Sequence, residues 1–161
     1  MSSTAPRLGL IADTHNLLDP VVKDLFAGVE HILHAGDIGQ PRVIAELERI
    51  APVTAVRGNT DDPGFGWRES EVLTLHGRKV FLHHIVNPHE PAEALARRLR
   101  RETPDIVVFG HTHQPFEAVI GGVLFLNPGS AGRARFHLSR SVAILHLAPN
   151  SLRVELCELG V

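Results

Sequence analysis

The sequence has little sulfur and few aromatic side chains. Cys157 is the only cysteine among the 161 residues, tyrosine is absent, and there is one tryptophan. A single cysteine excludes an internal disulfide, and one chain cannot build a thiolate zinc site or an iron–sulfur cluster from it. We therefore expect a reducing location, the cytoplasm.

Long apolar runs and an excess of positive charge are also missing. No apolar run approaches the roughly 20 residues that span a bilayer, and residues 1–15 lack the apolar segment of a secretory signal. The formal net charge is −2, so no overall basic field favours a membrane surface or a long nucleic-acid polymer as a partner. Nothing in the sequence sets the oligomeric state.

The first third of the chain alternates between strand and helix patterns. Compact apolar runs at 8–12, 32–35 and 53–56 predict buried strands, and spaced apolar residues at 20–29 and 42–50 predict helices. The order strand, helix, strand, helix, strand favours a parallel, doubly wound sheet.

The rest of the chain is richer in strand patterns. Segments 71–75 and 79–82 predict a hairpin around His76-Gly77-Arg78, and 91–101 is the clearest amphipathic helix. Further strands are expected at 105–109, 116–120, 123–126, 141–147 and 152–156. Because no linker or repeat interrupts this pattern, we expect a single domain over residues 1–161.

Polar side chains follow the buried strands at five places. These places are Asp13-Thr14-His15, Gly36-Asp37, Gly58-Asn59, His83-His84 and Gly110-His111-Thr112-His113. Each alone is typical of a turn. Sites in open α/β sheets form beyond the carboxyl ends of the strands, so all five are expected to deliver their side chains to one crevice.

The donors expected in that crevice contain no sulfur. They are Asp13, His15, Asp37, Asn59, His83, His111 and His113. Carboxylate oxygens and imidazole nitrogens suit manganese, iron, zinc, cobalt or nickel. The two aspartates would repel each other unless cations lay between them. This number and type of donors favours a site for two divalent ions, and a pair of ions is typical of enzymes that transfer a phosphoryl group to water.

The same ordered set, together with Asn127-Pro128-Gly129-Ser130, resembles the calcineurin-like metallophosphoesterases. Within them it is similar to the small single-domain bacterial and archaeal phosphodiesterases, and also to the phosphoesterase-fold subunit of retromer. The resemblance extends from Leu8 to about Leu159. It implies an α/β fold, a four-layer α/β/β/α sandwich of mixed sheets, with a dinuclear metal site at one edge of the sheets.

The resemblance also implies a role for each donor. It assigns the first metal to Asp13, His15, Asp37 and His113, with Asp37 bridging, and the second to Asn59, His83 and His111. Asp37, Asn59 and His111 are expected to act in catalysis as well. The implied reaction is in-line attack on a small phosphoester, a phosphodiester or phosphomonoester, by a hydroxide between two divalent ions. Manganese is the first expectation, with iron, zinc, nickel or cobalt as alternatives.

Two residues depart from the family pattern. Many relatives have His-Gly where this chain has His83-His84; the alignment favours His83 as the ligand, and a register shift of one residue would give His84. Thr60 stands where larger members of the superfamily carry a histidine that serves as a general acid or contacts the phosphate, so protonation of the leaving group has no assigned donor.

An alternative function is a phosphoesterase-fold scaffold with little or no catalysis, although retention of all seven donors favours an enzyme. His34 lies in the strand before Asp37 and is expected either in the core or orienting that carboxylate. Arg57, Arg133 and Arg135 are candidates for contact with a substrate phosphate, but arginines beside such turns are more often simply solvated.

Overall fold

The computed structural model describes residues 4–135 and 137–160. Its helices are α1 (Val21–Leu25), α2 (Arg42–Glu48) and α3 (Glu93–Glu102), with a short 3₁₀ helix, η1, at Pro63–Phe65. Its strands are β1 (Arg7–Ile11), β2 (His31–His34), β3 (Val53–Ala55), β4 (Ser70–Leu75), β5 (Arg78–His83), β6 (Ile106–Val108), β7 (Phe116–Ile120), β8 (Val123–Asn127), β9 (Arg140–Ala148) and β10 (Ser151–Gly160).

The strands form two mixed sheets of five strands each. The first sheet has the order β10-β9-β1-β2-β3, in which β1, β2 and β3 are parallel and β9 runs antiparallel to β1. The second sheet has the order β4-β5-β6-β8-β7, in which β5, β6 and β8 are parallel and the outer strands are antiparallel. Each sheet therefore contains three adjacent parallel strands, which end on one side of the sheet; they lie in the centre of the second sheet and extend to the β3 edge of the first.

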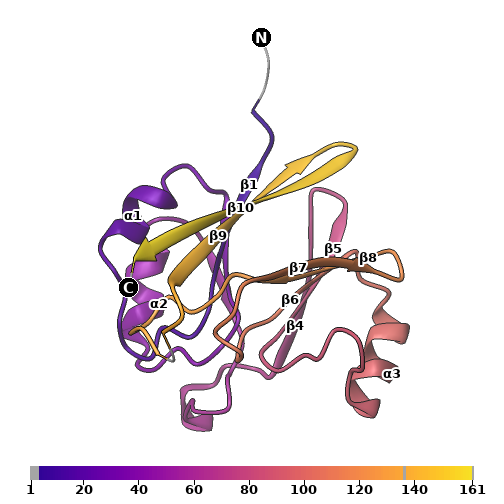
Figure 1. Cartoon of the computed structure of the whole chain (residues 1–161), viewed down its shortest axis with the longest axis horizontal. Coiled ribbons are helices and arrows are strands. Elements are labelled where there is room, and N and C mark those ends of the chain that lie inside the picture. Colours follow the sequence, from indigo (N-terminus) through magenta and orange to yellow (C-terminus); the bar gives the residue numbers. More distant parts are fainter. Residues whose placement is uncertain (1–3, 136, 161) are drawn as a thin grey trace.

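Three apolar clusters hold four layers together. Leu10 and Leu33 of the first sheet pack against Leu82 and Val108 of the second. On the outer side of the first sheet a separate cluster includes residues of α1 and α2, and on the outer side of the second sheet Leu95 and Leu99 of α3 cover the apolar side chains. Figure 1 shows α1 and α2 on one side of the molecule and α3 on the other. This confirms the predicted α/β/β/α sandwich.

Strands β1 to β3 of the first sheet are parallel, as predicted, but the sheet is not doubly wound. Helices α1 and α2 share one apolar cluster on one face of the sheet, and the other face packs on the second sheet. The physical reason is that an apolar sheet face can be buried by another sheet as well as by helices, and the strand patterns of the last third supply that sheet.

The ends of several elements differ from the predicted ones. Helix α1 is only five residues long, whereas the pattern predicted 20–29. The chain instead turns at Gly28, whose φ of +84° lies outside the helical region, before entering β2. The 3₁₀ helix η1 was not predicted; its first turn is stabilised by the Asp62 carboxylate, which accepts a hydrogen bond of 2.8 Å from the Gly64 amide.

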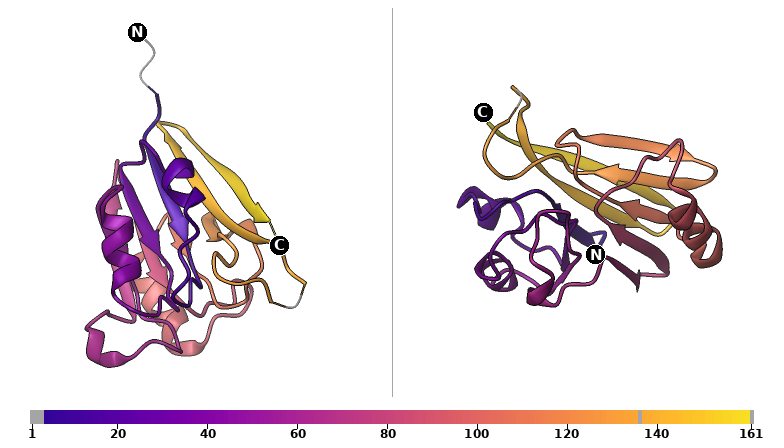
Figure 2. Two further views of the ribbon diagram at one scale, coloured as in Figure 1. Left: turned by 90° about the vertical axis from the view of Figure 1, so that its left-hand side faces the viewer. Right: turned by 90° about the horizontal axis from the view of Figure 1, so that it is seen from below.

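The carboxyl ends of the parallel strands position the site. In the left view of Figure 2, β1 to β3 run away from the N-terminus and the loops that follow them gather at the opposite end. Among the described residues, no helix is both long and apolar enough to cross a membrane.

Candidate metal centre

The loops after β1 and β2 are joined by backbone hydrogen bonds. The amides of Asp13 and His15 donate to the carbonyl oxygens of Gly36 and Asp37 at 2.9 and 3.0 Å. These bonds continue the parallel pairing of β1 with β2 beyond the ends of the strands. As a result, the two acidic side chains that the sequence places at separate strand ends are brought to one place.

Five of the predicted donor residues have a left-handed backbone. The φ angles are 55° at Asp13, 44° at His15, 54° at Asp37, 73° at His111 and 63° at His113. This region costs a residue with a Cβ atom about 1–2 kcal/mol. Such conformations persist where the surrounding structure enforces them, and they concentrate at functional sites.

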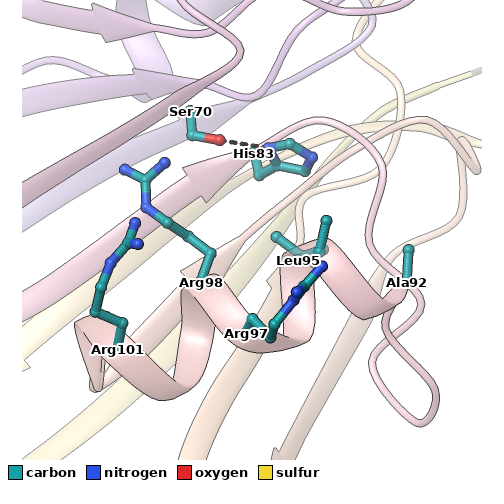
Figure 3. A pocket seen from close by; sticks show the side chains of 8 residues that line it. Ser70, His83, Ala92, Leu95, Arg97, Arg98 and Arg101 are labelled. Atoms are coloured by element: carbon teal, nitrogen blue, oxygen red, sulfur yellow. Dashed lines mark hydrogen bonds between the residues drawn. The ribbon is translucent and has the colours of Figure 1, made fainter.

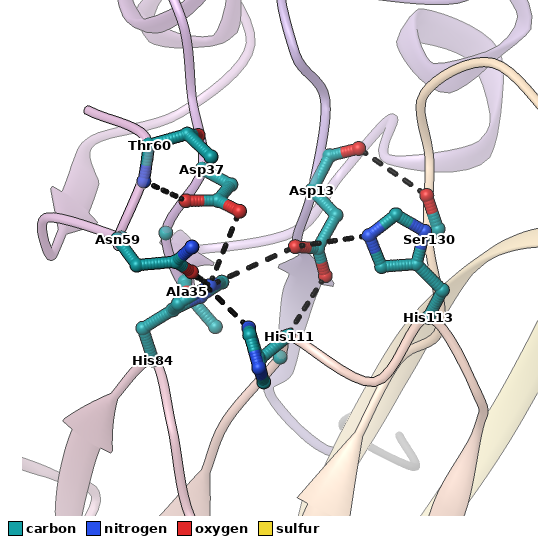
Figure 4. A network of polar contacts seen from close by, with 12 residues as sticks. Asp13, Ala35, Asp37, Asn59, Thr60, His84, His111, His113 and Ser130 are labelled. Carbon is teal, nitrogen blue, oxygen red and sulfur yellow. Dashed lines mark hydrogen bonds and ion pairs between the residues drawn. The ribbon is translucent and has the colours of Figure 1, made fainter.

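Two groups of side chains in this cluster have the spacing of metal ligands. Asp13, His15 and His113 form one, and Asp13, Asp37 and His84 form the other, with the ligand atoms of each within 4.8 Å of one another. Figure 4 shows Asp37 and His84 on one side of Asp13 and His113 on the other. Asp13 is common to both groups. Asp37 also reaches toward both, because its Oδ2 is 3.3 Å from His84 Nε2 and 3.7 Å from His15 Nε2.

The cluster contains buried polar atoms that lack a protein partner. Asp13 is completely buried, yet its Oδ1 has no hydrogen-bond partner among the described residues, and the buried Nε2 atom of His15 has none there either. A buried polar atom without a partner costs about 1–3 kcal/mol. A divalent cation coordinated by these atoms would remove that cost, so the donor set fits metal ions of the kind predicted.

Burial and charge shift the pKa values in the cluster in opposite directions. Burial raises the pKa of the Asp13 carboxyl to about 7, and the negative charge of Asp37 acts in the same direction. Burial also disfavours the charged form of Asp37, but hydrogen bonds from His84 and Thr60 outweigh it and hold the pKa of Asp37 well below its usual range. Although burial opposes it, the pKa of His84 is raised by its contacts with Asp37. The two carboxylates are thus adjacent, buried and in need of positive charge.

His84, not His83, belongs to this cluster. The Nδ1 of His84 lies 2.7 Å from the carbonyl oxygen of Ala35 and donates to it, so Nε2 is the nitrogen that faces the carboxylates. This is how metal-binding histidines are commonly held. The structure does not bring His83, the predicted ligand, into this cluster: its side chain lies on the other side of β5, where its Nδ1 is 2.7 Å from Ser70 Oγ.

Asn59 and His111 lie at the mouth of the cluster. The Oδ1 of Asn59 is 3.0 Å from His84 Nε2 and 3.1 Å from His111 Nδ1. The backbone amide of His111 donates to Asp13 Oδ2 at 3.1 Å, and its side chain is exposed. The structure therefore brings together six of the seven predicted donors, with His84 in place of the seventh.

His34 lies under the cluster in the core and is fully buried. Its Nδ1 accepts from the Gly36 amide at 3.2 Å, and its Nε2 lies 3.0 Å from Thr14 Oγ1, which itself donates to the carbonyl of Ile38. The network requires the neutral Nε2–H form, and burial lowers the pKa of His34 to about 3. His34 thus supports the loop that carries Asp37 and does not contact that carboxylate by a hydrogen bond.

Asp61 is a structural residue of the site whose role the sequence pattern did not predict. Its buried carboxylate accepts hydrogen bonds from the amides of Ile38, Gly39 and Gly58 at 3.1, 3.0 and 2.8 Å. It therefore joins the loop that follows β2 to the loop that follows β3. The one feature of the sequence that pointed to Asp61 was its position at the end of the Gly58-Asn59-Thr60-Asp61 motif.

Close approach of two backbones explains one glycine of this motif. A Cβ atom at Gly58 would overlap Asp37 Oδ1 and the Asp37 amide nitrogen. The absence of a side chain there lets Asn59 approach the cluster from β3.

The loop after β8 closes the other side of the cluster. The Nδ2 of Asn127 donates to the carbonyl of Gly110 at 3.0 Å, and Ser130 Oγ donates to the carbonyl of Asp13 at 3.3 Å. Of the candidate arginines, Arg57 is paired with Glu69 at 2.7 Å. Arg135 is exposed, and its positive charge adds to the effect of burial in lowering the pKa values of His15 and His113.

Comparison with known proteins gives matches over most of the chain. Residues 7–150 match the family model described as the calcineurin-like phosphoesterase superfamily domain. A probable metallophosphoesterase of Methanothermobacter thermautotrophicus is 34% identical over 160 residues, which cover 95% of this chain and 92% of that protein. A phosphodiesterase of Methanocaldococcus jannaschii is 27% identical over 141 residues, or 76% and 82% of the two chains.

Solved structures show the same fold. Wild-type Vps29 of Entamoeba histolytica, complexed with Zn²⁺, is 28% identical and superimposes with a TM-score of 0.72, covering 94% of this chain and 98% of that one. The fold of the present chain is thus similar to that of a protein whose solved structure is a complex with Zn²⁺.

Proposed function

The chain belongs to the calcineurin-like phosphoesterase superfamily, and from this we propose that it is a divalent-metal-dependent phosphodiesterase with a dinuclear site. The observation that carries the proposal is the pair of ligand groups that share Asp13, together with the unpartnered Asp13 Oδ1 and His15 Nε2. In two-metal phosphoester hydrolysis, the divalent ions supply Lewis acidity and activate a water molecule for attack on phosphorus.

The side chains divide between two metal positions. Asp13, His15 and His113 would hold one ion. Asp37 and His84 would hold the second together with Asn59, whose Oδ1 faces His84. Either carboxylate has the position to bridge, because Asp13 belongs to both groups and Asp37 lies between His15 and His84. Manganese is our first choice of metal, with iron, zinc, nickel or cobalt as alternatives.

The residues at the mouth of the cluster would bind and orient the phosphoryl group. His111 is exposed and next to Asn59, so its imidazole is available to hydrogen-bond a phosphoryl oxygen. A positioned donor of this kind stabilises the charge that develops on that oxygen. Asp37 is held in place by the Thr60 amide, which donates to its Oδ1 at 3.0 Å.

The Thr60 side chain offers no proton of suitable pKa to a leaving alkoxide, so the proposed substrates are esters with good leaving groups. A small phosphoester suits the exposed mouth better than a long nucleic acid, because the chain carries a net charge of −2 and no long basic track is evident in its sequence.

The test is hydrolysis of bis-p-nitrophenyl phosphate by the metal-stripped protein after addition of Mn²⁺. We expect turnover in the wild type and a loss of more than about 100-fold in His84→Ala and Asp37→Asn, since removal of even an outer partner of a metal ligand costs 10–100-fold. His76→Asn is the matched control, because His76 is an exposed histidine in the turn before β5. Tight binding of Mn²⁺ without hydrolysis of any phosphoester would contradict the proposal and favour a scaffold.

A further inference from the structure

A second pocket lies between α3 and the end of β5, outside the metal cluster. It has a volume of about 580 Å³, within the usual range for ligand sites. We call it the α3 pocket; its lining includes Ser70, His83, Leu95, Arg97, Arg98 and Arg101. Figure 3 shows Arg98 extending toward Ser70, with Arg97 and Arg101 on either side of it along the helix.

The charged side chains that line the α3 pocket are all positive. Arg98 is fixed by its pairing with Glu102 at 3.1 Å, and its guanidinium lies 5.4 Å from the centre of the Phe81 ring. Within residues 4–135 and 137–160, neither Arg97 nor Arg101 takes part in an ion pair. Both are exposed, so the pocket has two guanidinium groups whose charge no carboxylate offsets.

The helix dipole accounts for only part of this arrangement. Arg100 and Arg101 lie in the last turn of α3, where positive charge offsets the partial negative charge of the helix end. Arg97 lies one turn earlier, beyond the range of that effect, yet it lines the same pocket. A planar guanidinium matches the geometry of phosphate oxygens, and two such groups on one wall favour a phosphate over a monovalent carboxylate.

His83 connects the α3 pocket to the metal cluster. A neighbouring pocket of about 370 Å³ is lined by Asn59 and His84 of the cluster and also by His83 and Ile85. His83 therefore borders both cavities. Because consecutive side chains of a strand point to opposite faces, His83 and His84 separate two sites that lie one residue apart along the chain.

We propose that the α3 pocket binds a second phosphate group of the substrate. This inference rests on the proposed phosphodiesterase function: the scissile phosphodiester lies at the metal cluster, and a further phosphate of the same molecule passes His83 and is bound by Arg97 and Arg101. The substrate class is then a phosphodiester that carries an additional phosphomonoester group.

The first test is binding, which does not depend on catalysis. Pyrophosphate is titrated by calorimetry into metal-free protein at low ionic strength. In this form the uncompensated carboxylates of the cluster repel anions, so binding reports on the α3 pocket. We expect Arg97→Gln/Arg101→Gln to weaken binding by about tenfold or more, because charge-assisted contacts to phosphate are among the stronger hydrogen bonds.

Arg100→Gln is the matched control for this experiment. Arg100 is exposed on the same helix but does not line the pocket, so its replacement is expected to change the affinity less than twofold. If the control and the double variant lost affinity for pyrophosphate equally, the binding would depend only on the overall charge of the helix, and the proposal would fail. Absence of binding to the wild type would overturn it as well.

The second test compares two substrates that differ in one phosphate. They are the p-nitrophenyl ester of thymidine 5′-phosphate and the same ester carrying a 3′-phosphate. With Mn²⁺ present, we expect the 3′-phosphorylated substrate to have a KM at least about fivefold lower in the wild type, with that advantage lost in Arg97→Gln/Arg101→Gln and kept in Arg100→Gln. The kcat is expected to change little, because the arginines do not touch the reacting phosphate.

The outcomes separate the two proposals. Hydrolysis of both substrates with equal KM would refute the second phosphate site and leave the phosphodiesterase function supported. Failure to hydrolyse either substrate, with pyrophosphate binding that depends on Arg97 and Arg101, would refute the catalytic function and support a phosphate-binding pocket.

Discussion

Asp61 provides the sharpest test of how the site is held together, because it contacts the cluster only through backbone amides. Its Oδ2 accepts from Ile38 and Gly58, and its Oδ1 accepts from Gly39. In Asp61→Asn, the best orientation keeps the amide oxygen on the first two donors and turns the NH₂ group against the Gly39 amide. One hydrogen bond is then lost, and two fall from charged to neutral strength.

The magnitude follows from these three bonds. A hydrogen bond to a charged group contributes about 1.5–3 kcal/mol, and a neutral one is roughly half as strong. The expected loss in the free energy of unfolding is therefore about 3–6 kcal/mol for Asp61→Asn. It rises to about 5–9 kcal/mol for Asp61→Ala, where all three amides lose their partner. Native domains have only about 5–15 kcal/mol in total, so the alanine variant approaches unfolding.

The assay is urea unfolding of the metal-free protein at pH 7.5, followed by Mn²⁺ titration of the folded variant. We expect a 10–100-fold weaker affinity for Mn²⁺ in Asp61→Asn, because Asp61 positions the loop of Asp37 and is itself no ligand. Asp62→Asn is the matched control: Asp62 also accepts from a backbone amide, that of Gly64, but at the surface, and should lose less than about 1 kcal/mol. Equal losses in the two variants would refute the reasoning.

Three further predictions concern acid stability, backbone packing and metal linkage. The pKa of His34 is about 3 in the folded chain, below its unfolded value of 6.5, so the unfolded state binds the extra proton and stability falls as the pH drops below 6.5. We expect a loss of about 2 kcal/mol at pH 5 from this group, and a pH slope smaller by about one proton in His34→Asn; identical slopes in urea unfolding would contradict this. Gly58→Ala places a Cβ atom against Asp37, so calorimetry should show at least about tenfold weaker Mn²⁺ binding, and unchanged affinity would show that the loops can separate. Mn²⁺ at about 100 times its Kd should raise the Tm of the wild type by roughly 5–10 °C, because ligand binding of that strength adds about 2.7 kcal/mol. Asp37→Asn should lose most of that rise, and a full rise would remove Asp37 from the ligand set.

The four layers of this fold were implied by the family resemblance, whereas hydrophobic patterning predicted its strands and helices but not every boundary. Strands such as β6 and β8 follow from short apolar runs, because a strand buried on both faces needs no alternation. The length of α1 did not follow, since its apolar residues continue to Val29 while the backbone turns at Gly28. The role of Asp61 was also out of reach, because its three donors come from two loops that only the folded sheet brings together.

The sequence by itself determined that acidic and histidine side chains follow the strands, and with them the family and the type of metal donor. It also determined that His83 and His84 point to opposite sides of β5. Which of the two faces the carboxylates was decided only by the tertiary structure. Val80, Phe81 and Leu82 are all apolar and fully buried, so the strand itself does not reveal which face lies between the sheets. The packing of α3 against Phe81 and of the first sheet against Leu82 fixes that choice, and alternation along the strand then places His84 at the metal cluster and His83 in the α3 pocket.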